Sequence, residues 1–572
     1  MLSASLRRVL RAIPFVLAAC TTTPPREAAP APQPFVPAGA AKRVVLISFD
    51  GLGADALAEQ VGLRAFEWMR QAGTAARVVT VNPTQTSVAH STILTGAAAD
   101  RHGIVANRFH LPGTPFTETS HGLNVDLSAE TLLEAARRQG KRVGSLAFPT
   151  IDGRTARRTA DFGLYWSQPV LRPHTVSLAR RNFRGEWVPP TWTRREPPYP
   201  SFSPVMRARV DCGRGLTPPM DVQLVVYDTT DDRRENYDAL IVEASGHEVP
   251  VDARGWFALT RRAGDDLQGS WSRIVAIEPD LSSARVYCGS FTTTSAYPAA
   301  FRAIVEEEAG FWPGEPDAAA GAEIFREQVD RFSNFFTRVQ TAAIRRMPFD
   351  LLLAYQPHVD ESSHSFLITR TSQKSYTAES SAVASGVRRG AFEATDRAIA
   401  STAAALDLTN DALVVVGDHG LTPVDTELRV NRLLAENGFL ERWRAFASGN
   451  VANVYRTAGS NDETTKVAEV LRKSGFFELV RMKNASSHPN SGDIVATSYP
   501  NVMLTPSSEA PLTAQPRENG SHGALNTHRE LHTVFFAVGA GVPKRDGGEI
   551  PQTKIARYVS TLLGIGAPSS AE

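Results

Sequence analysis

The 572-residue sequence predicts an α/β fold with a mostly parallel central sheet flanked by helices and interrupted by a β-rich insertion. Strand-like and helix-like patterns alternate along residues 43–148 and again along 322–563, as they do where helices connect parallel strands. Some strand-like segments are continuous apolar runs, such as Val44–Phe49, which is typical of strands buried on both faces. Between the two regions, alternating apolar and polar residues favour antiparallel strands instead.

The first 20 residues are predicted to be a targeting signal. Three arginines precede a short apolar run, residues 12–19, which is too short to span a membrane. The run ends in Leu17-Ala-Ala-Cys20, which resembles a bacterial lipobox, where the cysteine is lipidated and becomes the new N-terminus. An ordinary signal peptide is the alternative, but a cysteine directly after two small residues favours lipidation. Thr21 follows instead of Asp, which in the lipoproteins resembled implies the outer membrane, facing the periplasm.

Beyond the signal we expect a tether and an α/β domain in two parts. Residues 21–40 are rich in Thr, Pro and Ala and are predicted to be extended. The α/β domain is predicted over 41–165 and 321–572, with the β-rich insertion at 166–320. No later stretch is apolar enough to cross a bilayer, so the lipid is the only membrane contact expected.

The composition argues against one class of partner and indicates the redox state of two cysteines. The chain has 61 basic and 60 acidic residues, and such a balance argues against nucleic acid as a bulk electrostatic partner. Apart from Cys20, the only cysteines are Cys212 and Cys288, both in the predicted insertion. In an oxidising periplasm these two are expected to form a disulfide, and two free buried thiols are the alternative. The sequence indicates no oligomeric state.

Each element is predicted from its local pattern. Apolar runs bounded by charged residues mark strands, and amphipathic segments closed by glycine mark helices. One such helix begins near Thr86, after a loop rich in Pro and Thr, and ends at Gly96. In chain order the predicted elements are strand 43–49, helix 63–71, strand 76–81, helix 86–95, helix 127–138, strand 142–148, insertion strands 222–227, 239–243 and 274–277, helix 322–346, strand 349–354, helix 382–405, strand 412–416, strand 532–538 and helix 553–563.

Acidic and histidine side chains follow several predicted strands. Asp50 directly ends one strand, and Asp418 and His419 end another. Asp360 and His364 follow a third and are four residues apart, so that one helical turn would direct both at one ion. Ligands in open α/β sheets bind beyond the carboxyl ends of the strands, and carboxylates with neutral imidazoles suit zinc.

Thr86 admits two interpretations. A hydroxyl at a helix start is commonly an N-cap, and for a lone threonine that role would be preferred. Beside a metal site and donors directed at an anion, the same hydroxyl becomes a nucleophile toward phosphorus. The surrounding acidic and histidine residues favour the second interpretation.

Seven motifs together resemble the alkaline phosphatase superfamily, most closely its nucleotide pyrophosphatase/phosphodiesterase family. The resemblance covers 43–150 and 348–565 and implies an alkaline-phosphatase-like fold. The motifs are Asp50-Gly51, Pro83-Thr-Gln-Thr86, Leu94-Thr-Gly96, His102-Gly-Ile-Val-Ala-Asn107, Asp360-x-x-x-His364, Gly417-Asp-His-Gly420 and Gly520-Ser-His-Gly523.

The resemblance implies two zinc ions and a covalent mechanism. One zinc would be bound by Asp360, His364 and His522. The other would be bound by Asp50, Asp418 and His419, with Thr86 as its reactive ligand. The reaction implied is in-line attack by Thr86 on a phosphate ester, giving a phospho-threonine that water hydrolyses.

Two further residues match positions that contact substrate in the family. Asn107 matches a residue that donates a hydrogen bond to a phosphoryl oxygen, and a turn residue is the alternative. Tyr355 matches an aromatic that lines the leaving-group pocket, and packing at a strand end is the alternative. Gln85 stands where the family usually has Lys, and Ser87-Val-Ala89 stands where it has Phe-Pro-Asn.

The predicted function is therefore a two-zinc phosphodiesterase or nucleotide pyrophosphatase acting on a small phosphate ester. A phosphomonoesterase on the same metals is the alternative within enzymes. A sulfatase is disfavoured because no Cys/Ser-x-Pro-x-Arg sequence is present. A surface lipoprotein with a structural zinc site is the alternative from another class, and it predicts a lost ligand or nucleophile.

Overall fold

A computed structural model of the chain describes residues 35–185, 203–230, 232–244, 247–460 and 462–572. A nine-stranded sheet lies at its centre, in the order β18-β6-β5-β19-β1-β20-β30-β2-β31. Its strands are β1 (Arg43–Phe49), β2 (Thr74–Val79), β5 (Val143–Leu146), β6 (Phe162–Leu164), β18 (Ala296–Tyr297), β19 (Leu351–Gln356), β20 (Asp411–Gly417), β30 (Thr533–Gly539) and β31 (Arg545–Pro551).

The sheet is mostly parallel, as the sequence predicts. β6, β5, β19, β1 and β20 pair in parallel, and so do β2 and β31. β30 is antiparallel to both β20 and β2, and β18 is antiparallel to β6. The α/β prediction is confirmed, with antiparallel pairs limited to β30 and the edge strand β18.

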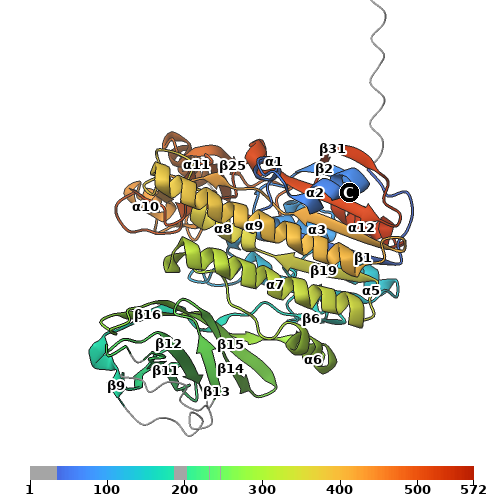
Figure 1. The fold of residues 1–572 in the computed structure, drawn as a ribbon. Coiled ribbons are helices and arrows are strands. Elements are labelled where there is room, and N and C mark those ends of the chain that lie inside the picture. The colour runs from blue at the N-terminus through green and yellow to red at the C-terminus, as the bar shows by residue number, and fades with distance from the viewer. Residues whose placement is uncertain (1–34, 186–202, 231, 245–246, 461) are drawn as a thin grey trace, which may run out of the picture. The chain divides into compact units, whose positions relative to one another are not determined.

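Helices cover both faces of the central sheet. Alternate residues of β1 contact helices on opposite faces. Val45, Ile47 and Phe49 join one core with α2 (Arg64–Ala72), α7 (Ala322–Arg346) and α9 (Ala378–Ala405). In Figure 1 the long helices α7 and α9 run side by side across this face. The alternate residue Ser48 contacts His90 of α3 (Thr86–Thr95) on the other face, where α3, α5 (Leu132–Arg138) and α12 (Lys554–Leu562) pack together. No helix in the described part of the chain is long and apolar enough to cross a membrane.

Two antiparallel sheets and their own apolar core form the insertion. One has the order β13-β12-β11-β10-β9, and the other β7-β17-β15-β16-β8 with β14 paired to β15. The strands are β7 (Pro169–Leu171), β8 (His174–Leu178), β9 (Arg184–Gly185), β10 (Met206–Arg209), β11 (Val222–Tyr227), β12 (Ala239–Ala244), β13 (His247–Val251), β14 (Trp256–Ala263), β15 (Asp266–Ile277), β16 (Ala284–Cys288) and β17 (Phe291–Thr294).

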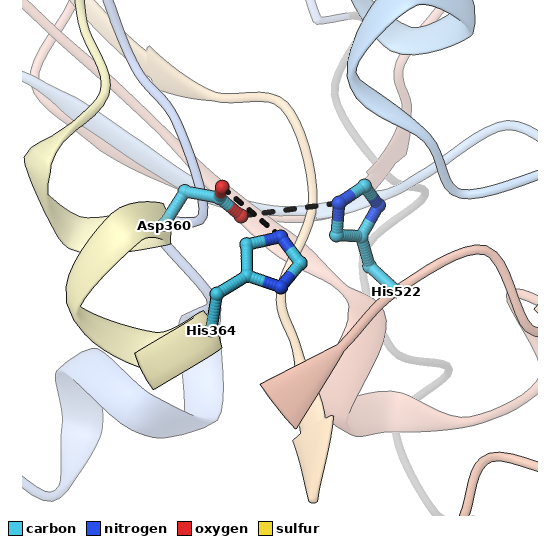
Figure 2. Close-up of side chains that lie close together, drawn as sticks. All are labelled: Asp360, His364 and His522. Atoms are coloured by element: carbon cyan, nitrogen blue, oxygen red, sulfur yellow. Dashed lines mark ion pairs between the residues drawn. The ribbon is translucent and has the colours of Figure 1, made fainter. Parts of the chain in front are cut away.

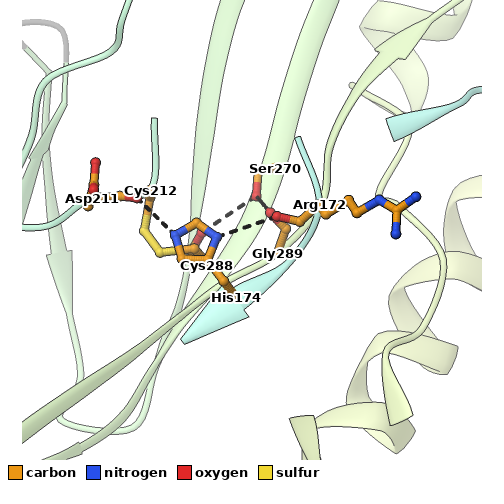
Figure 3. Close-up of a disulfide and its surroundings, with 8 residues drawn as sticks. Arg172, His174, Asp211, Cys212, Ser270, Cys288 and Gly289 are labelled. Atoms are coloured by element: carbon orange, nitrogen blue, oxygen red, sulfur yellow. Dashed lines mark hydrogen bonds between the residues drawn. A yellow bond between two sulfur atoms is a disulfide. The ribbon is translucent and has the colours of Figure 1, made fainter. Parts of the chain in front are cut away.

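A disulfide joins Cys212, between β10 and β11 of one sheet, to Cys288 at the end of β16 in the other (Figure 3). Their Cα atoms are 5.2 Å apart, and 76 residues separate them along the chain. His174 of β8 lies beside the bridge, with its Nε2 2.9 Å from the carbonyl oxygen of Asp211. The bridge thus connects the two sheets of the insertion.

A further sheet of four antiparallel strands lies in the segment after β20, and the sequence did not predict it. It has the order β23-β24-β26-β25, and its apolar core includes α10 (Val430–Glu436) and α11 (Asp462–Lys473). Its strands are β23 (Trp443–Ser448), β24 (Val451–Arg456), β25 (Phe477–Met482) and β26 (Ile494–Ser498). Smaller elements are α1 (Ala54–Ala58), α4 (Ala99–His102), α6 (Ala299–Glu308), β3 (Arg108–Phe109), β4 (Ser120–His121), β22 (Thr426–Arg429), β27 (Val502–Thr505) and β28 (Thr513–Ala514).

Several boundaries differ from those predicted, and two of them have a clear structural reason. α5 begins at Leu132 instead of 127, because Thr131 and Glu134 form a capping box that starts the helix there. β18, inside the segment predicted as insertion, pairs with β6 in the central sheet. The antiparallel sheets of the insertion therefore end at Thr294, and the chain returns to the α/β domain with β18 and α6.

Candidate active site

Three adjacent strands of the central sheet end at the candidate site. β19, β1 and β20 are neighbours and parallel, so their carboxyl ends meet at one edge of the sheet. Asp50 directly follows β1 and Asp418 directly follows β20. The backbone N–H of Gly51 donates to Oδ1 of Asp418 at 3.0 Å, which holds the two strand ends together. Both carboxylates are buried.

The helix after β19 contributes the first cluster. α8 (His358–Phe366) carries Asp360 and His364 one turn apart, and His364 Nε2 lies 3.2 Å from Asp360 Oδ2. His522 Nε2 lies 4.0 Å from Asp360 Oδ1. Figure 2 shows the three side chains pointing toward one another. One potential ligand atom from each lies within 4.8 Å of the other two, a spacing that fits a single metal ion.

A short antiparallel pair brings His522 to this cluster. β29 (Gly520–Ser521) pairs with β21 (Thr422–Pro423), which follows His419 closely in sequence. As a result, the imidazoles of His419 and His522 stack with their centroids 3.8 Å apart. These two histidines lie more than a hundred residues apart in sequence.

The second cluster contains Asp50, Asp360 and His419, whose ligand atoms also lie within 4.8 Å of one another. His419 Nε2 is 3.5 Å from Asp50 Oδ1 and 3.1 Å from Asp418 Oδ2. The family resemblance implied Asp360 as a ligand of one ion only, whereas in the structure Asp360 belongs to both clusters. Two adjacent clusters of this kind are consistent with a binuclear metal site.

The histidine rings are oriented for metal binding by backbone carbonyls. Nδ1 of His364 lies 2.8 Å from the oxygen of Gly520, and Nδ1 of His522 lies 3.1 Å from that of Thr84. Nδ1 of His419 lies 3.2 Å from the oxygen of Gly420. If each Nδ1 carries the proton and donates it to its carbonyl, each Nε2 keeps a lone pair facing the cluster.

Three carboxylates of the site each have a buried oxygen without a hydrogen-bond donor, and bound cations would neutralise their negative charge. Oδ1 of Asp50, Oδ1 of Asp360 and Oδ2 of Asp418 are buried and have no hydrogen-bond partner among the described residues. Burial, together with the charges of Asp418 and Asp360, raises the pKa of Asp50 well above its ordinary value. Burial likewise raises the pKa of Asp418 to about 7. Buried oxygens without donors, beside imidazole nitrogens, fit divalent metal ions.

Thr86 is the first residue of α3, with Gln85 as the extended residue before it. Its Oγ1 lies 3.1 Å from His419 Nε2, at the second cluster. Thr86 does not form the side-chain cap of α3, because no side-chain cap is present and Gln85 occupies the N-cap position. The hydroxyl therefore faces the candidate metal ligands, at the positive end of the helix dipole.

Asn107 lies beside the start of α3 with its orientation fixed. Its Oδ1 accepts from the backbone N–H of Ser87 at 2.9 Å and from the Ser87 hydroxyl at 2.5 Å. Its Nδ2 donates no hydrogen bond to the described residues, which leaves two donors for a ligand. The backbone N–H of Asn107 donates to Oε1 of Gln85 at 2.7 Å, so Gln85 joins the Asn107 loop to the Thr86 loop.

Tyr355 contacts the site through one of the metal ligands. Its hydroxyl donates to Oδ2 of Asp50 at 2.5 Å, and its ring lies edge-on to His90, 5.2 Å between centroids. The side chain is 8% exposed. The substrate contact predicted for Tyr355 stays a prediction, while the structure adds a role in orienting Asp50.

Two residues that support the site, His90 and Gln552, were not predicted from the sequence. His90 places Nδ1 2.9 Å from the carbonyl oxygen of Thr86 and 3.5 Å from Oδ2 of Asp418. Burial lowers the pKa of His90 to about 4, which keeps its ring neutral. Gln552 donates to the carbonyl oxygen of Asp418 at 2.7 Å. His90 is on one face of α3 with Thr86, which is a local signal; nothing in the sequence near Gln552 indicates its role.

The remaining predicted residues lie either away from the clusters or outside the part of the chain that the structure describes. Cys212 and Cys288 are in the insertion, and the lipidation residue Cys20 lies outside the described residues. The site described here thus includes all seven predicted metal ligands and Asn107, and it places Tyr355 behind Asp50.

Comparison with known proteins finds one matching family and several similar proteins. A family described as "Type I phosphodiesterase / nucleotide pyrophosphatase" matches residues 44–237 and 264–525, well over half of the chain. A bis(5'-adenosyl)-triphosphatase, enpp4 of Xenopus laevis, is 32% identical over 142 residues. That match covers 24% of this chain and 30% of the relative, so the chain spans less than a third of that protein's length in the alignment.

Solved structures of two further proteins are similar over most of the chain. Human ectonucleotide pyrophosphatase/phosphodiesterase 5 aligns with 14% identity and a TM-score of 0.49, covering 92% of this chain and 96% of that one. Phosphonoacetate hydrolase from Sinorhizobium meliloti 1021, in complex with phosphonoformate, aligns with 16% identity and a TM-score of 0.47. The same 92% of this chain and 96% of that one are covered.

Proposed function

We propose a reaction for this chain from one premise: it belongs to the type I phosphodiesterase/nucleotide pyrophosphatase family of hydrolases. The reaction is hydrolysis of a phosphate diester or pyrophosphate bond in a small molecule, through a covalent intermediate on Thr86. Two zinc ions are the cofactors proposed. The Xenopus relative is named as a bis(5'-adenosyl)-triphosphatase, and nucleotide polyphosphates therefore belong among the candidate substrates.

The position of the Thr86 hydroxyl supports this proposal. It lies 3.1 Å from His419 Nε2, beside two clusters of carboxylates and imidazoles that share Asp360. A structural zinc site would need no hydroxyl there, and a helix cap would have its oxygen turned back to α3. The hydroxyl stands where a phosphorus atom bound between the clusters would be within reach.

Each residue has a distinct part in the proposed reaction. Thr86 Oγ1 attacks phosphorus in line, its bond to phosphorus forms as the bond to the leaving oxygen breaks, and water later cleaves the phospho-threonine. Nδ2 of Asn107, which donates to no other described residue, donates to a phosphoryl oxygen that gains charge in the transition state.

The ligands proposed for one zinc are Asp360, His364 and His522, and those for the other are Asp50, Asp418, His419 and Thr86. When bound, the zinc ions would stabilise negative charge on the attacking and leaving oxygens. The protein holds the imidazoles by their Nδ1 hydrogen bonds and holds Asp50 through Tyr355. These contacts keep the ligands in place before substrate arrives.

Thr86→Ala tests the mechanism. The variant should retain its metal but lose several orders of magnitude in turnover, since the attacking oxygen is gone. Thr86→Ser should keep part of the activity because the hydroxyl remains. Near-normal turnover in Thr86→Ala, with metal content unchanged, would contradict the mechanism.

The substrate class is tested separately. Hydrolysis of bis-nitrophenyl phosphate should exceed that of nitrophenyl phosphate, and a chelator should abolish both. A reversed preference would instead identify a phosphomonoesterase on the same metals. Elemental analysis that finds no zinc in active protein would remove the zinc assignment.

We also propose that the protein is anchored by a lipid on Cys20, in the bacterial outer membrane and facing the periplasm. The Leu-Ala-Ala-Cys20 sequence after a short apolar run supports this. Cys20→Ser should leave the protein unlipidated, so that it no longer partitions into detergent. Unchanged partitioning would contradict the anchor.

A further inference from the structure

Gln85 and Ser87, the residues on either side of Thr86, lie beneath the candidate site. Both are fully buried, whereas Thr86 and Asn107 are partly exposed. Both also differ from the Lys and Phe that are usual at these positions in the family. Because neither side chain reaches the surface, any part that they have in a reaction must be through a neighbour.

The amide of Gln85 makes two hydrogen bonds of opposite polarity. Its Oε1 accepts from the backbone N–H of Asn107 at 2.7 Å, and its Nε2 donates to the carbonyl oxygen of Ser448 at 2.6 Å. Ser448 is the last residue of β23. A lysine has donors but no acceptor, so it could not accept from Asn107. The bond to the Asn107 backbone therefore depends on the amide that this chain has.

Ser87 holds the same asparagine by its side chain. Its backbone N–H and its hydroxyl both donate to Oδ1 of Asn107, and the carbonyl oxygen of Asn107 accepts from the backbone N–H of Gly122 at 2.9 Å. A Cβ on Gly122 would lie 2.5 Å from Ser87 Oγ, so this close approach requires glycine. With the N–H, the carbonyl and Oδ1 all engaged, the direction of the Asn107 Nδ2 donor is set.

The space around the Gln85 amide is closely fitted. A Cβ on Gly523, directly after His522, would lie 3.0 Å from Gln85 Nε2, and one on Gly449 would lie 3.2 Å from the same atom. The backbone N–H of Asn450 donates to the carbonyl oxygen of His522 at 3.1 Å. The amide thus lies between the turn that joins β23 to β24 and the backbone beside a proposed metal ligand.

We propose that Gln85 and Ser87 are positioning residues, which together hold Asn107 so that its Nδ2 faces the phosphoryl group attacked by Thr86. The inference rests on the proposed function and adds to it the residues that set the position of the donor relative to the nucleophile. Because Gln85 and Ser87 flank Thr86, one three-residue segment fixes both. A displacement of roughly 1 Å at such a position can lower a rate about a hundredfold.

Two single variants test the proposal with bis-nitrophenyl phosphate as substrate. Gln85→Met removes both amide hydrogen bonds at similar volume and should lower kcat about 10–100-fold, with little change in KM, because the donor acts in the transition state. Ser87→Ala keeps the backbone N–H to Asn107 and should lower kcat by about three- to tenfold. Gln340→Met, which removes a buried amide in α7 that bonds Thr402, is the matched control and should keep its kcat.

A double-mutant cycle shows whether the two residues act through Asn107. Added to Asn107→Ala, either substitution should have almost no further effect on kcat, because the group that it positions is already absent. Multiplicative losses in the double variants would overturn the proposal, as would wild-type kcat in both Gln85→Met and Ser87→Ala. If Gln85→Met does not fold, Ser87→Ala decides, since it removes a single oxygen atom.

The cycle also separates failure of this inference from failure of the proposed function. Near-normal kcat in Asn107→Ala would contradict the role proposed for Asn107, and the positioning role would fail with it. An impaired Asn107→Ala beside unimpaired Gln85 and Ser87 variants would overturn the positioning role alone.

Discussion

At the scale of single residues, the site depends on side chains whose polar atoms are already directed by neighbours. Ser87 holds Oδ1 of Asn107, which leaves the Nδ2 donors free. Three backbone carbonyls orient the imidazoles of His364, His419 and His522. Because these contacts exist without substrate, little reorganisation is needed when charge develops on the phosphoryl oxygens in the proposed reaction.

Asn107→Ala should reduce kcat/KM by about 10²–10³-fold, or roughly 3–4 kcal/mol, because a donor to the charged transition state is lost. Asn107→Asp keeps an acceptor for Ser87 but has no Nδ2, so it should lose at least as much. Steady-state kinetics on the bis-ester substrate measures both. A variant Asn107→Asp with near-normal kcat would show that Nδ2 is not the important group.

His102 should make the protein sensitive to acid. The ring is buried between Thr92 and the backbone N–H of Ile104, and burial lowers its pKa to about 3. Because the folded-state pKa lies below the unfolded value, its stabilising contribution is present above pH 6.5 and is lost as pH falls toward 3. Between pH 6.5 and 5 this amounts to about 2 kcal/mol.

Denaturant unfolding of His102→Gln against the wild type measures this contribution. The variant loses stability at neutral pH, but its unfolding free energy should fall less steeply between pH 6.5 and 5. Parallel pH profiles for the two proteins would contradict the assignment to His102, because the other buried histidines are common to both.

At the scale of secondary structure, local sequence signals place the ends of elements near the site. Gly96 ends α3 in the left-handed conformation, with φ 68°, where glycine is favoured. Thr131 and Glu134 begin α5 with reciprocal hydrogen bonds. α5 packs against α3, so the cap fixes a neighbour of the helix that carries Thr86.

Thr131→Ala should lower the free energy of unfolding by about 1 kcal/mol, because the N–H of Glu134 loses its acceptor at the helix start. Thr131→Ser keeps the hydroxyl and is the control. Thermal and urea unfolding measure the difference, and turnover at low temperature should be unchanged. Equal stability of the Ala and Ser variants would show that the cap contributes nothing.

At the scale of the whole molecule, the candidate site joins distant parts of the chain. Its acidic and histidine residues extend from Asp50 to His522 and come from strand ends, one helix and a loop. The insertion has its own core and its own disulfide, and none of the site residues comes from it. Metal binding should therefore stabilise the α/β domain as a unit.

Removal of metal by a chelator should lower the melting temperature, and added zinc should restore it, because the buried carboxylates then lose their counter-charge. His522→Ala, which lacks one ligand, should show a smaller response to zinc. Thr131→Ser is a suitable control, since it leaves every ligand intact. A melting temperature indifferent to chelator and zinc would contradict a metal site.

The sequence by itself determined the fold class and most of the site residues. Buried parallel strands are long apolar runs, and a polar residue directly after such a run stands at the edge where ligands bind, so Asp50 and Asp418 were visible locally. The i, i+4 spacing of Asp360 and His364 on α8 was equally local. The family motifs added Thr86, Asn107 and His522.

Only the tertiary structure decided which of these residues lie together in each cluster and which neighbours support them. The β21–β29 pair brings His522 against His419, and Asp360 stands between the two clusters. The small sheet β23–β26 was not predicted, because its register depends on pairing between strands that helices and loops separate in the sequence. Contacts of this kind depend on long-range packing, which local periodicity does not record.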